Sequence, residues 1–538
     1  MPVLDLATAR ARSYDICVVG SGAAGMALAL SSHGRGLRVL MVEQGSMSPG
    51  EANEMPCGVL SRDAAHDPLD QVSCRALGGT LHWWGGRAVP LDPEDFEPLQ
   101  AGGAAPWPLS YDEYTAWVPQ AAEFLGVSDV FSDPLGPPWT ALDAPNSDHV
   151  ERLTKGPKLV SALAQRVLAP DGPDVLLQTA ATGLNIAGIE PDATVTGLEV
   201  LSAGETTTLQ ARHFALCAGG LEVARLLLAD HRRRGGTDPG MLGRGYMGHL
   251  TGSIGTIRLS DPEAIRHFGY TSQGGKRPAR RRLMPRIAGQ PNIAFWIENL
   301  AMDDPAHGSG IQSLKFLALR SRAVGGAFLS APLRWKLAGE KPLRFWAHLR
   351  NIATEPATTA WRALRLLRRR LRSDDRPADL LVPNRSGHYR LAYHAEQLPD
   401  PANRVVLTDR TDALGRPLLQ IDLRYGPADI EAVLEAHLAL AESLSTAGLA
   451  EISLVGRRED LLQMIDRQAR DGYHQMGLTR MAERPSEGVV DRNCRVFGMR
   501  NLFVASASIF PRSGQANPTL SIVAFALRLA DHLAREGR

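Results

Sequence analysis

The sequence predicts an α/β fold, α+β over the whole chain, in which a parallel sheet built from both chain ends carries an inserted, mainly antiparallel sheet. Three observations predict it. Residues 14–19 form an apolar run that leads into a glycine-rich turn. Residues 254–423 contain short alternating segments with long connections, which is typical of antiparallel strands with one covered face. Residues 470–538 return to glycine-punctuated strands and a closing helix.

The most informative local motif is the turn at Gly20, Gly22 and Gly25. Gly20 allows a tight turn, Gly22 lets the backbone approach a pyrophosphate, and Gly25 lets the next helix pack close to the strand. Amides at the start of that helix, including those of Ala23 and Ala24, then present the positive end of the helix dipole to the phosphates. The turn therefore predicts a Rossmann-like, dinucleotide-binding unit.

Two further segments support this unit. An apolar strand over 37–42 ends at Glu43, roughly 20 residues past the glycines, where a carboxylate can accept hydrogen bonds from a ribose diol. Another strand, over 211–217, ends in Ala218 and Gly219 before a helical pattern, so the backbone again passes close to a ligand. Strand, helix, second strand and terminal acid in register are far more specific than the glycines alone.

The other elements divide the chain into three segments. The remaining predicted strands are 175–178, 254–259, 292–298, 389–393 and 418–423, and the predicted helices are 428–445 and 519–535. We expect residues 1–250 to form the first part of the nucleotide-binding domain, 251–469 to form the inserted substrate domain, and 470–538 to complete the first domain with the catalytic residues.

The composition is that of an ordinary globular protein. The 538 residues are 44% hydrophobic and 22% charged, and the net charge of +1 gives no pull toward nucleic acid. Five scattered cysteines without a CxxC pair predict no disulfide framework and no metal site. The N-terminus lacks the apolar core of a signal peptide, and no apolar run reaches about 18 residues, so we expect a cytoplasmic protein.

A basic segment interrupts the predicted substrate domain. Residues 334–372 hold eleven Lys/Arg against two Glu, with Trp361 and Leu364 at helical spacing among arginines. A basic amphipathic helix with aromatic residues is typical of peripheral contact with an anionic membrane. The alternative is a solvated helical cap on the substrate domain. A second basic cluster, over 276–286, predicts a surface loop.

Three blocks together resemble the glucose–methanol–choline (GMC) flavoprotein oxidoreductases. They are the N-terminal turn, the stretch RALGGTLHWWGGR at 75–87, and the C-terminal motifs YHQMG at 473–477 and SGQANPT at 513–519. The second and third blocks are closest to bacterial sugar-oxidising members, such as fructose dehydrogenase-like and glycoside 3-dehydrogenase-like enzymes. The resemblance implies an FAD-binding domain, FAD as cofactor, and oxidation of a CH–OH group.

The resemblance places the second block against the flavin. It assigns cofactor contact to Gly78, Gly79, Thr80 and His82, and glycines suit this role because their backbone can approach a flat ring without a side chain intervening. Some family members attach FAD covalently to a histidine at the position that Trp83 holds here. We therefore expect FAD to be bound non-covalently.

The resemblance also makes His474 the active-site histidine and Asn517 its partner. Oxidation of an alcohol removes a hydride, which the flavin accepts, and a hydroxyl proton, which needs a base. A neutral imidazole can serve as that base near pH 7, and an amide can hydrogen-bond the developing oxyanion. His249, in the motif GYMGH, is expected to be structural.

The final helix is the last predicted cofactor contact. Pro518 stands at a tolerated first-turn position, so helix amides are expected to face the flavin edge that gains negative charge on reduction, with Thr519 adding a hydroxyl. Ser506 stands where many relatives carry Asp or Gly, and we assign it to cofactor contact as well.

Substrate and electron acceptor stay open. A sugar, glycoside or polyol is the first expectation, and a hydroxylated natural product or sterol is the alternative, because a fold does not fix a substrate. A redox-silent FAD-containing lyase is a second alternative. A nicotinamide-linked dehydrogenase would leave the second and third blocks without a role. The flavin could be reoxidised by oxygen, a quinone or a protein.

Overall fold

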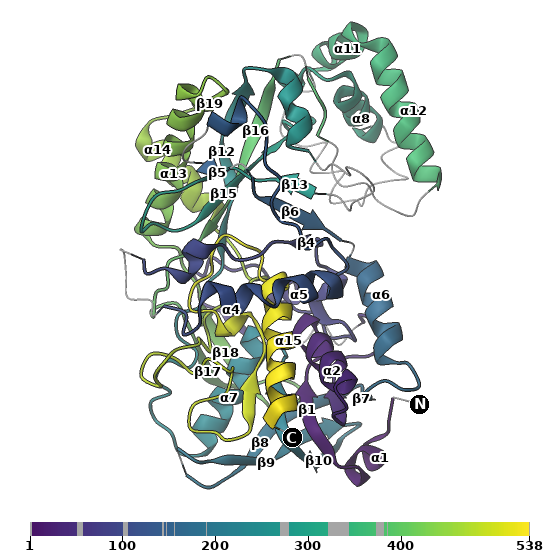
Figure 1. Ribbon diagram of the computed structural model, residues 1–538, viewed down its shortest axis with the longest axis vertical. Coiled ribbons are helices and arrows are strands. Elements are labelled where there is room, and N and C mark those ends of the chain that lie inside the picture. Colours follow the sequence, from purple (N-terminus) through teal and green to yellow (C-terminus); the bar gives the residue numbers. More distant parts are fainter. Residues whose placement is uncertain are drawn as a thin grey trace.

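The computed structural model describes residues 3–50, 57–99, 106–141, 145–146, 148–154, 156–189, 191–269, 279–320, 344–372, 381–384 and 386–536. In Figure 1 the lower half of the molecule holds a parallel sheet together with α1 (Leu6–Ala11) and α15 (Thr519–Glu536), which come from opposite ends of the chain. The upper half holds an antiparallel sheet and its helices. This arrangement confirms the predicted fold class.

The parallel sheet has the strand order β20 (Leu502–Val504), β11 (Ala211–Leu216), β1 (Tyr14–Val19), β2 (Val39–Val42) and β7 (Asp174–Leu176), and each neighbouring pair is parallel. The central strand β1 (Tyr14–Val19) is almost entirely apolar and buried, as expected for a strand covered on both faces. After the glycine turn the chain enters α2 (Ala23–Gly34), against which α15 packs. Because β20 (Leu502–Val504) lies beside β11 (Ala211–Leu216), the sheet draws strands from both ends of the chain.

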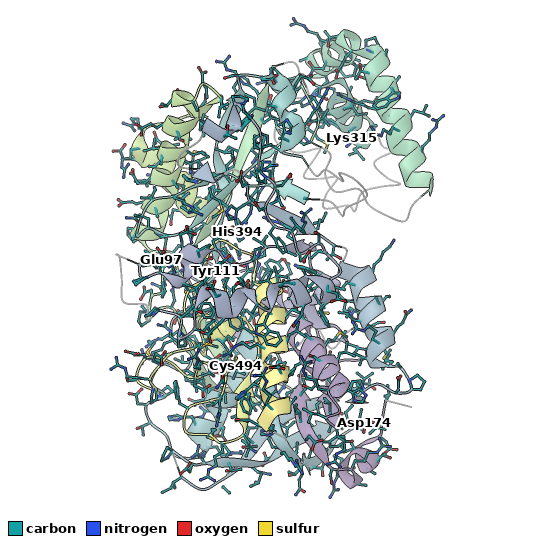
Figure 2. All side chains as sticks on the ribbon, viewed as in Figure 1. Glu97, Tyr111, Asp174, Lys315, His394 and Cys494 are labelled. Carbon is teal, nitrogen blue, oxygen red and sulfur yellow. The ribbon has the colours of Figure 1, made fainter. Side chains whose placement is uncertain are left out.

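The antiparallel sheet has the order β15 (Ile293–Glu298), β16 (His388–Glu396), β12 (His249–Leu259) and β19 (Ala450–Leu454). Side chains alternate between its faces, so Phe295 and Tyr393 join the apolar core under α13 (Pro427–Thr446) and α14 (Arg458–Gln468), while His394 lies on the opposite face. Figure 2 shows His394 at the junction between the upper and lower halves.

One predicted strand belongs to a different sheet. The segment 418–423, expected in the inserted sheet, forms β18 (Pro417–Asp422), which pairs with β17 (Arg404–Thr411) and, in parallel, with β3 (Gly58–Leu60). These strands pack on α7 (Gly220–Arg233) in the lower half. Strand pairing therefore crosses the predicted boundary at residue 251, because pairing depends on long-range contacts that periodicity does not encode.

The second basic cluster is also not a loop where the structure describes it. Ala279–Arg281 form β13, which pairs with β6 (Val150–Leu153). Arg280 and Arg282 are buried, and Arg280 forms an ion pair with the fully buried Glu151 at 2.7 Å. The ion pair with the buried Glu151 carboxylate stabilises the guanidinium of Arg280 in a buried position. The surface-loop prediction is therefore wrong for these residues.

The remaining bounds complete the fold. The other helices are α3 (Leu69–Val72), α4 (Tyr111–Thr115), α5 (Val118–Phe124), α6 (Gly156–Val167), α8 (Gly310–Arg320), α11 (Phe345–Thr354) and α12 (Pro356–Arg372). The other strands are β2 (Val39–Val42), β4 (Arg87–Ala88), β5 (Pro145–Asn146), β7 (Asp174–Leu176), β8 (Thr179–Ala187), β9 (Thr194–Ser202), β10 (Glu205–Leu209), β12 (His249–Leu259), β14 (Met284–Pro285), β15 (Ile293–Glu298), β16 (His388–Glu396) and β19 (Ala450–Leu454). Within the described ranges no helix has both the length and the apolar character of a membrane span.

A buried histidine makes the stability of the upper half depend on pH. The ring of His437 lies between Phe295 and Tyr393, with centroid distances of 4.6 and 5.4 Å. Burial lowers its pKa to about 4. As the pH falls below about 6.5, His437 becomes protonated in the unfolded chain but stays neutral in the folded chain. The free energy of unfolding therefore decreases between pH 6.5 and about pH 4.

We expect His437→Leu to weaken this pH dependence. The shift corresponds to at most about 3 kcal/mol between pH 6.5 and 4. Urea unfolding at pH 7 and pH 5 should therefore show a smaller fall in the free energy of unfolding for the variant than for the wild type. His388→Gln, at an exposed position, is the matched control. An unchanged pH slope in His437→Leu would contradict the prediction.

Candidate active site

A cavity of about 450 Å³ lies at the carboxyl ends of β1, β2 and β11. This edge of a doubly wound parallel sheet is where such folds bind nucleotides. Most of the predicted site residues border the cavity: Gly20, Gly22, Ala23, Ala24, Glu43, Gly79, Thr80, Ala218, Gly219, His474, Ser506, Asn517, Pro518 and Thr519. Gly25, Gly78 and His82 do not line it. Residues from both ends of the chain thus meet in one cavity.

The glycine turn is shaped by its own backbone. Gly20 has a φ of 99°, a conformation that favours glycine, and it packs against the backbone of Ala218. A Cβ atom on Gly25 would collide with the carbonyl oxygen of Gly20, so Gly25 closes the strand–helix junction from outside the cavity. A Cβ atom on Gly22 would meet nothing within 4 Å, which leaves open space beside the N-terminus of α2.

This open space gives a direct test of nucleotide binding. Gly22→Val should leave the apoprotein about as stable as wild type, because the added Cβ atom meets nothing within 4 Å, while the new side chain fills the space beside the helix N-terminus and lowers FAD affinity at least about tenfold. Affinity is measured by titrating apoprotein with FAD and following flavin fluorescence. Gly34→Val, at another glycine with nothing within 4 Å but outside the cavity, is the matched control. Equal FAD affinity in both variants would refute the assignment.

Glu43 ties the glycine turn to the second strand. Its Oε2 accepts hydrogen bonds from the amide and hydroxyl of Ser21, at 3.0 and 2.5 Å, and its Oε1 accepts one from the amide of Gly45 at 2.7 Å. Burial raises the pKa of this carboxyl, and the hydrogen bonds from Ser21 and Gly45 oppose the rise. The acid at the end of β2 thus holds the turn in shape at the border of the cavity.

The second glycine block crosses over this turn. Gly79 has a φ of 53°, and a Cβ atom there would come within 3.0 Å of the Cα of Gly22. Gly78 donates its amide to the Ser21 hydroxyl at 3.2 Å. The ring of His82 donates from Nε2 to the carbonyl of Leu77 at 3.0 Å. Gly78 and His82 therefore support the loop from outside the cavity, although the sequence analysis predicted that both contact the cofactor.

His474 borders the cavity and is held by a carboxylate that sequence analysis missed. Its Nδ1 lies 2.8 Å from Oδ2 of Asp471, and the other carboxylate oxygen accepts the amides of Gly472 and Tyr473 at 2.6 and 2.9 Å. Burial raises the pKa of Asp471, but His474 and His249 outweigh it and leave this pKa well below its usual range. A buried anion therefore fixes both the loop and the imidazole ring.

The hydrogen bonds define which nitrogen of His474 carries the proton. Because Asp471 accepts at Nδ1, the neutral ring keeps its proton there and has its lone pair on Nε2. Nε2 accepts a hydrogen bond from the side-chain amide of Asn517 at 3.2 Å. The basic nitrogen and the Asn517 amide thus lie together at the cavity, which is the arrangement that a proton acceptor beside a reacting hydroxyl requires.

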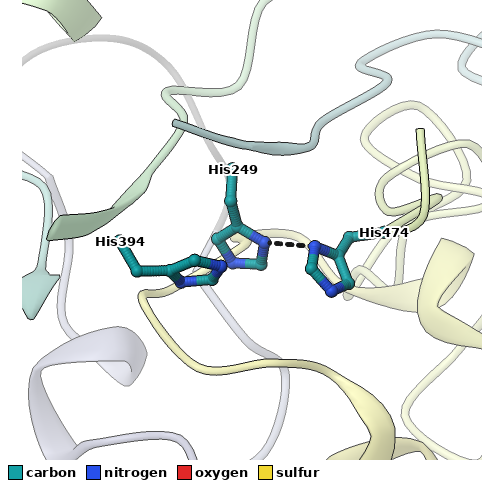
Figure 3. A group of neighbouring side chains, drawn as sticks. All are labelled: His249, His394 and His474. Carbon is teal, nitrogen blue, oxygen red and sulfur yellow. Dashed lines mark hydrogen bonds between the residues drawn. The ribbon is translucent and has the colours of Figure 1, made fainter. Parts of the chain in front are cut away.

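Two more imidazoles back this site (Figure 3). His249 donates from Nε2 to the carbonyl of Gly514 at 3.0 Å, so its Nδ1, 2.9 Å from Nδ1 of His474, is an acceptor that shares the single Nδ1 proton of His474 with Asp471. His394 donates from Nδ1 to the carbonyl of Gln515 at 2.6 Å, and its ring centroid lies 4.1 Å from that of His249. Burial lowers the pKa of both rings, so they stay neutral behind the base.

The cluster has the spacing of a metal site but the bonding of a proton-handling network. Nitrogen atoms of His249, His394 and His474 lie within 4.8 Å of one another. In the described hydrogen bonds His474 Nδ1 is engaged by Asp471, and its Nε2 by Asn517. A metal at these atoms would have to break the bonds that orient the ring, so we interpret the cluster as part of the acid–base machinery.

Sequence reasoning missed residues for identifiable reasons. Asp471 stands three residues before His474, a spacing that could have indicated a carboxylate–imidazole pair. His249 was expected to be structural but touches His474. His394 lies in a β-strand with no motif around it, and only strand pairing brings it to the site. Gln475, which accepts the amide of Leu221 and borders the cavity, carries no sequence signal either.

The residues around the cavity fit FAD. The open space at Gly22 suits a pyrophosphate at a helix N-terminus, and the acid of Glu43 suits a ribose. At the other end the side-chain oxygen of Asn517 is buried and has no hydrogen-bond partner among the described residues, as expected of an atom that serves a bound group. One cavity thus joins a nucleotide-binding turn to an acid–base pair.

Comparison with known proteins agrees with this geometry. Residues 399–526 match the GMC oxidoreductase family, and residues 15–53 match an FAD binding domain. The chain is 26% identical to paromamine 6'-oxidase of Streptomyces fradiae over 97% of this chain and 92% of that protein. It is 24% identical to 6'''-hydroxyparomomycin C oxidase of Streptomyces lividus over 98% and 93% of the two chains. Over 26% of the chain and 24% of the relative it is 30% identical to the fructose dehydrogenase large subunit of Gluconobacter japonicus.

Solved structures support the fold over the whole chain. Pyridoxine 4-oxidase from Mesorbium loti superposes with a TM-score of 0.51 at 19% identity, covering 96% of this chain and 99% of that one. An FAD-dependent oxidoreductase from Chaetomium thermophilum gives a TM-score of 0.54 at 14% identity, covering 98% and 100%. With its glycine turn, its cavity at the carboxyl ends of the parallel strands and its histidine–asparagine pair, and with residues 399–526 matching the GMC oxidoreductase family, the chain is an FAD-dependent enzyme that oxidises alcohols.

Proposed function

We propose that this enzyme oxidises a CH–OH group of a sugar, glycoside or polyol to a carbonyl, with His474 as the base. The observation that carries the proposal is the unprotonated Nε2 of His474, which lies at the cavity and accepts a hydrogen bond from the Asn517 amide. When bound, FAD supplies a hydride acceptor, its N5 atom. The chain itself must then bind the alcohol and remove its hydroxyl proton.

The proton's path follows from the hydrogen bonds. Nε2 of His474 accepts the hydroxyl proton as the C–H bond is broken, because a free alkoxide would be too costly to form first. The side chain of Asn517 hydrogen-bonds the oxygen on which negative charge develops. The imidazolium that results carries a proton on each nitrogen, and the buried Asp471 carboxylate at 2.8 Å stabilises it. The neutral neighbours His249 and His394 add no repulsion.

The substrate class is inferred from the relatives. Two proteins that align over nearly the whole chain are oxidases named for paromamine and hydroxyparomomycin, and a third is a fructose dehydrogenase subunit. These names favour a hydroxyl on a sugar or amino sugar over a sterol. A redox-silent lyase is disfavoured, because the two relatives that align over nearly the whole chain are named as oxidases.

Flavin bleaching tests the proposal directly. Purified holoenzyme is mixed anaerobically with sugars, glycosides, amino sugars and sterols, and flavin absorbance is followed. We expect loss of oxidised-flavin absorbance with at least one carbohydrate and none with sterols. Bleaching by sterols alone would replace the substrate class, and cyanohydrin cleavage without bleaching would replace the reaction. Reoxidation by oxygen, a soluble quinone or a carrier protein, measured on the bleached enzyme, then selects the acceptor.

Two finer features belong to the same proposal. FAD is held non-covalently, because Trp83 stands at the attachment position and the His82 ring is engaged by Leu77 outside the cavity; acid precipitation should release all flavin into the supernatant. We place the enzyme in the cytoplasm, where all five cysteines, each free and buried, would stay reduced.

A further inference from the structure

The basic segment forms a helical corner separate from the active site. Of the predicted range 334–372, residues 344–372 lie within the described part of the chain, as α11 and α12. Both helices pack against α8, at the end of the molecule farthest from the parallel sheet (Figure 1). Inside this unit the ring of His348 packs against that of Phe316 with a centroid distance of 4.7 Å, and it forms a hydrogen bond with the hydroxyl of Ser313 at 3.0 Å. One face of each of the helices α11 and α12 therefore packs against α8.

The opposite faces carry large apolar side chains in solvent. The side chains of Trp346 and Trp361 are 80% and 57% exposed, and Phe345 and Leu364 are 40% and 46% exposed. On α12, Trp361, Leu364, Arg365 and Arg368 follow one another at three- and four-residue spacing, so they share a face. Exposed tryptophans are unusual on a soluble surface, and their gathering on two adjoining helices indicates a partner.

The positive charge of this corner indicates the kind of partner that it binds. Residues 344–372 contain eight arginines and one glutamate, and that glutamate, Glu355, accepts the amide of Gly310 within the unit. Arg344, Arg350, Arg365 and Arg368 form no ion pair with any residue that the structure describes. Arg365 lies over the ring of Trp361 at 5.2 Å. Arginine beside tryptophan suits a boundary between lipid phosphates and acyl chains.

We propose that α11 and α12 dock the enzyme on an anionic lipid bilayer. Trp346 and Trp361 enter the interface, while the unpaired arginines face lipid phosphates. A nucleic acid or an acidic protein would use the positive charge but would leave Phe345 and Leu364 without a role, whereas a bilayer uses both. Docking brings the enzyme to membrane quinones, one of the three classes of electron acceptor considered above.

Vesicle cosedimentation of the holoenzyme tests this proposal. Wild type should pellet with phosphatidylglycerol–phosphatidylcholine vesicles at low salt and much less with pure phosphatidylcholine vesicles. It should not pellet at about 1 M salt, because the Debye length is then only about 3 Å and the attraction between arginines and lipid phosphates is screened. Arg365→Glu with Arg368→Glu should lower partitioning at least about 25-fold, since each basic residue contributes about fivefold near such a surface. Trp346→Ser with Trp361→Ser should lower it as well. Brominated lipids should quench wild-type tryptophan fluorescence.

Matched controls separate docking from general surface effects. Val455→Ser changes a residue that is 81% exposed, and Arg457→Glu a side chain that is 83% exposed, both on the antiparallel-sheet side. Both controls should bind vesicles like wild type, and all variants should keep FAD and turnover. No pelleting with anionic vesicles at low salt would overturn the proposal. So would binding that the tryptophan variant retains in full, which would point to a polyanion such as nucleic acid.

Discussion

Replacing His474 with alanine is expected to slow flavin reduction by the alcohol about 10²- to 10⁴-fold while FAD stays bound. The reason is that the ring supplies the lone pair that accepts the hydroxyl proton, and the described residues at the cavity offer no second base oriented by a carboxylate. The measurement is anaerobic stopped-flow absorbance at saturating substrate, so that binding and chemistry are separated.

The control for this variant is another histidine on the protein. His388→Ala removes an exposed ring far from the cavity and should leave the reduction rate unchanged. Partial recovery of the His474→Ala rate by added imidazole would strengthen the assignment further. A variant that bound FAD normally and was reduced as fast as wild type would remove His474 from the mechanism.

Asp471→Asn is expected to lower the reduction rate by a similar factor, through the tautomer of His474. The remaining carbonyl oxygen can still accept the amides of Gly472 and Tyr473, whereas the amide of His249, which Oδ2 accepts at 2.8 Å, loses its acceptor. The new NH₂ group, however, faces Nδ1 of His474 and must donate to it. The ring proton then moves to Nε2, which loses its lone pair as a base. Asp471 is a positioning residue, since it acts through His474.

Three readouts separate this role from a structural one. The Asp471→Asn variant should keep its FAD affinity and its KM while kcat falls about 10²-fold or more. Asp471→Ala also removes the oxygen that accepts the amides of Gly472 and Tyr473, so this variant should have a lower melting temperature as well. Glu459→Asn, at an exposed acid on α14, is the control and should change none of these. Equal kcat in Asp471→Asn and wild type would show that the carboxylate does not set the tautomer.

Acid stability provides an independent check on Asp471. Its folded pKa lies well below its usual range, so its carboxylate contributes stability above the unfolded value of about 3.9 and loses it as the pH falls further. Asp471→Asn should therefore flatten the loss of stability below about pH 4, while His437→Leu acts between pH 6.5 and 4. The two pH windows keep the two effects apart.

The sequence by itself determined the parts of this protein whose chemistry lies in short contiguous motifs. Gly20, Gly22 and Glu43 could be placed at a nucleotide site because a tight turn, an open helix N-terminus and a strand-end acid act within one local unit. His474 and Asn517 could be paired because family motifs surround both.

Only the tertiary structure decided which side chains contact the base, His474, and its neighbours. His249 and His394 come from neighbouring strands, and Asp471 from the loop before His474, and they meet because β12 pairs with β16. Tertiary contacts likewise moved β18 to the other half of the molecule and turned His82 away from the cavity. The physical reason is that strand pairing and ring orientation are set by contacts between residues far apart in the chain, and periodicity carries no record of them.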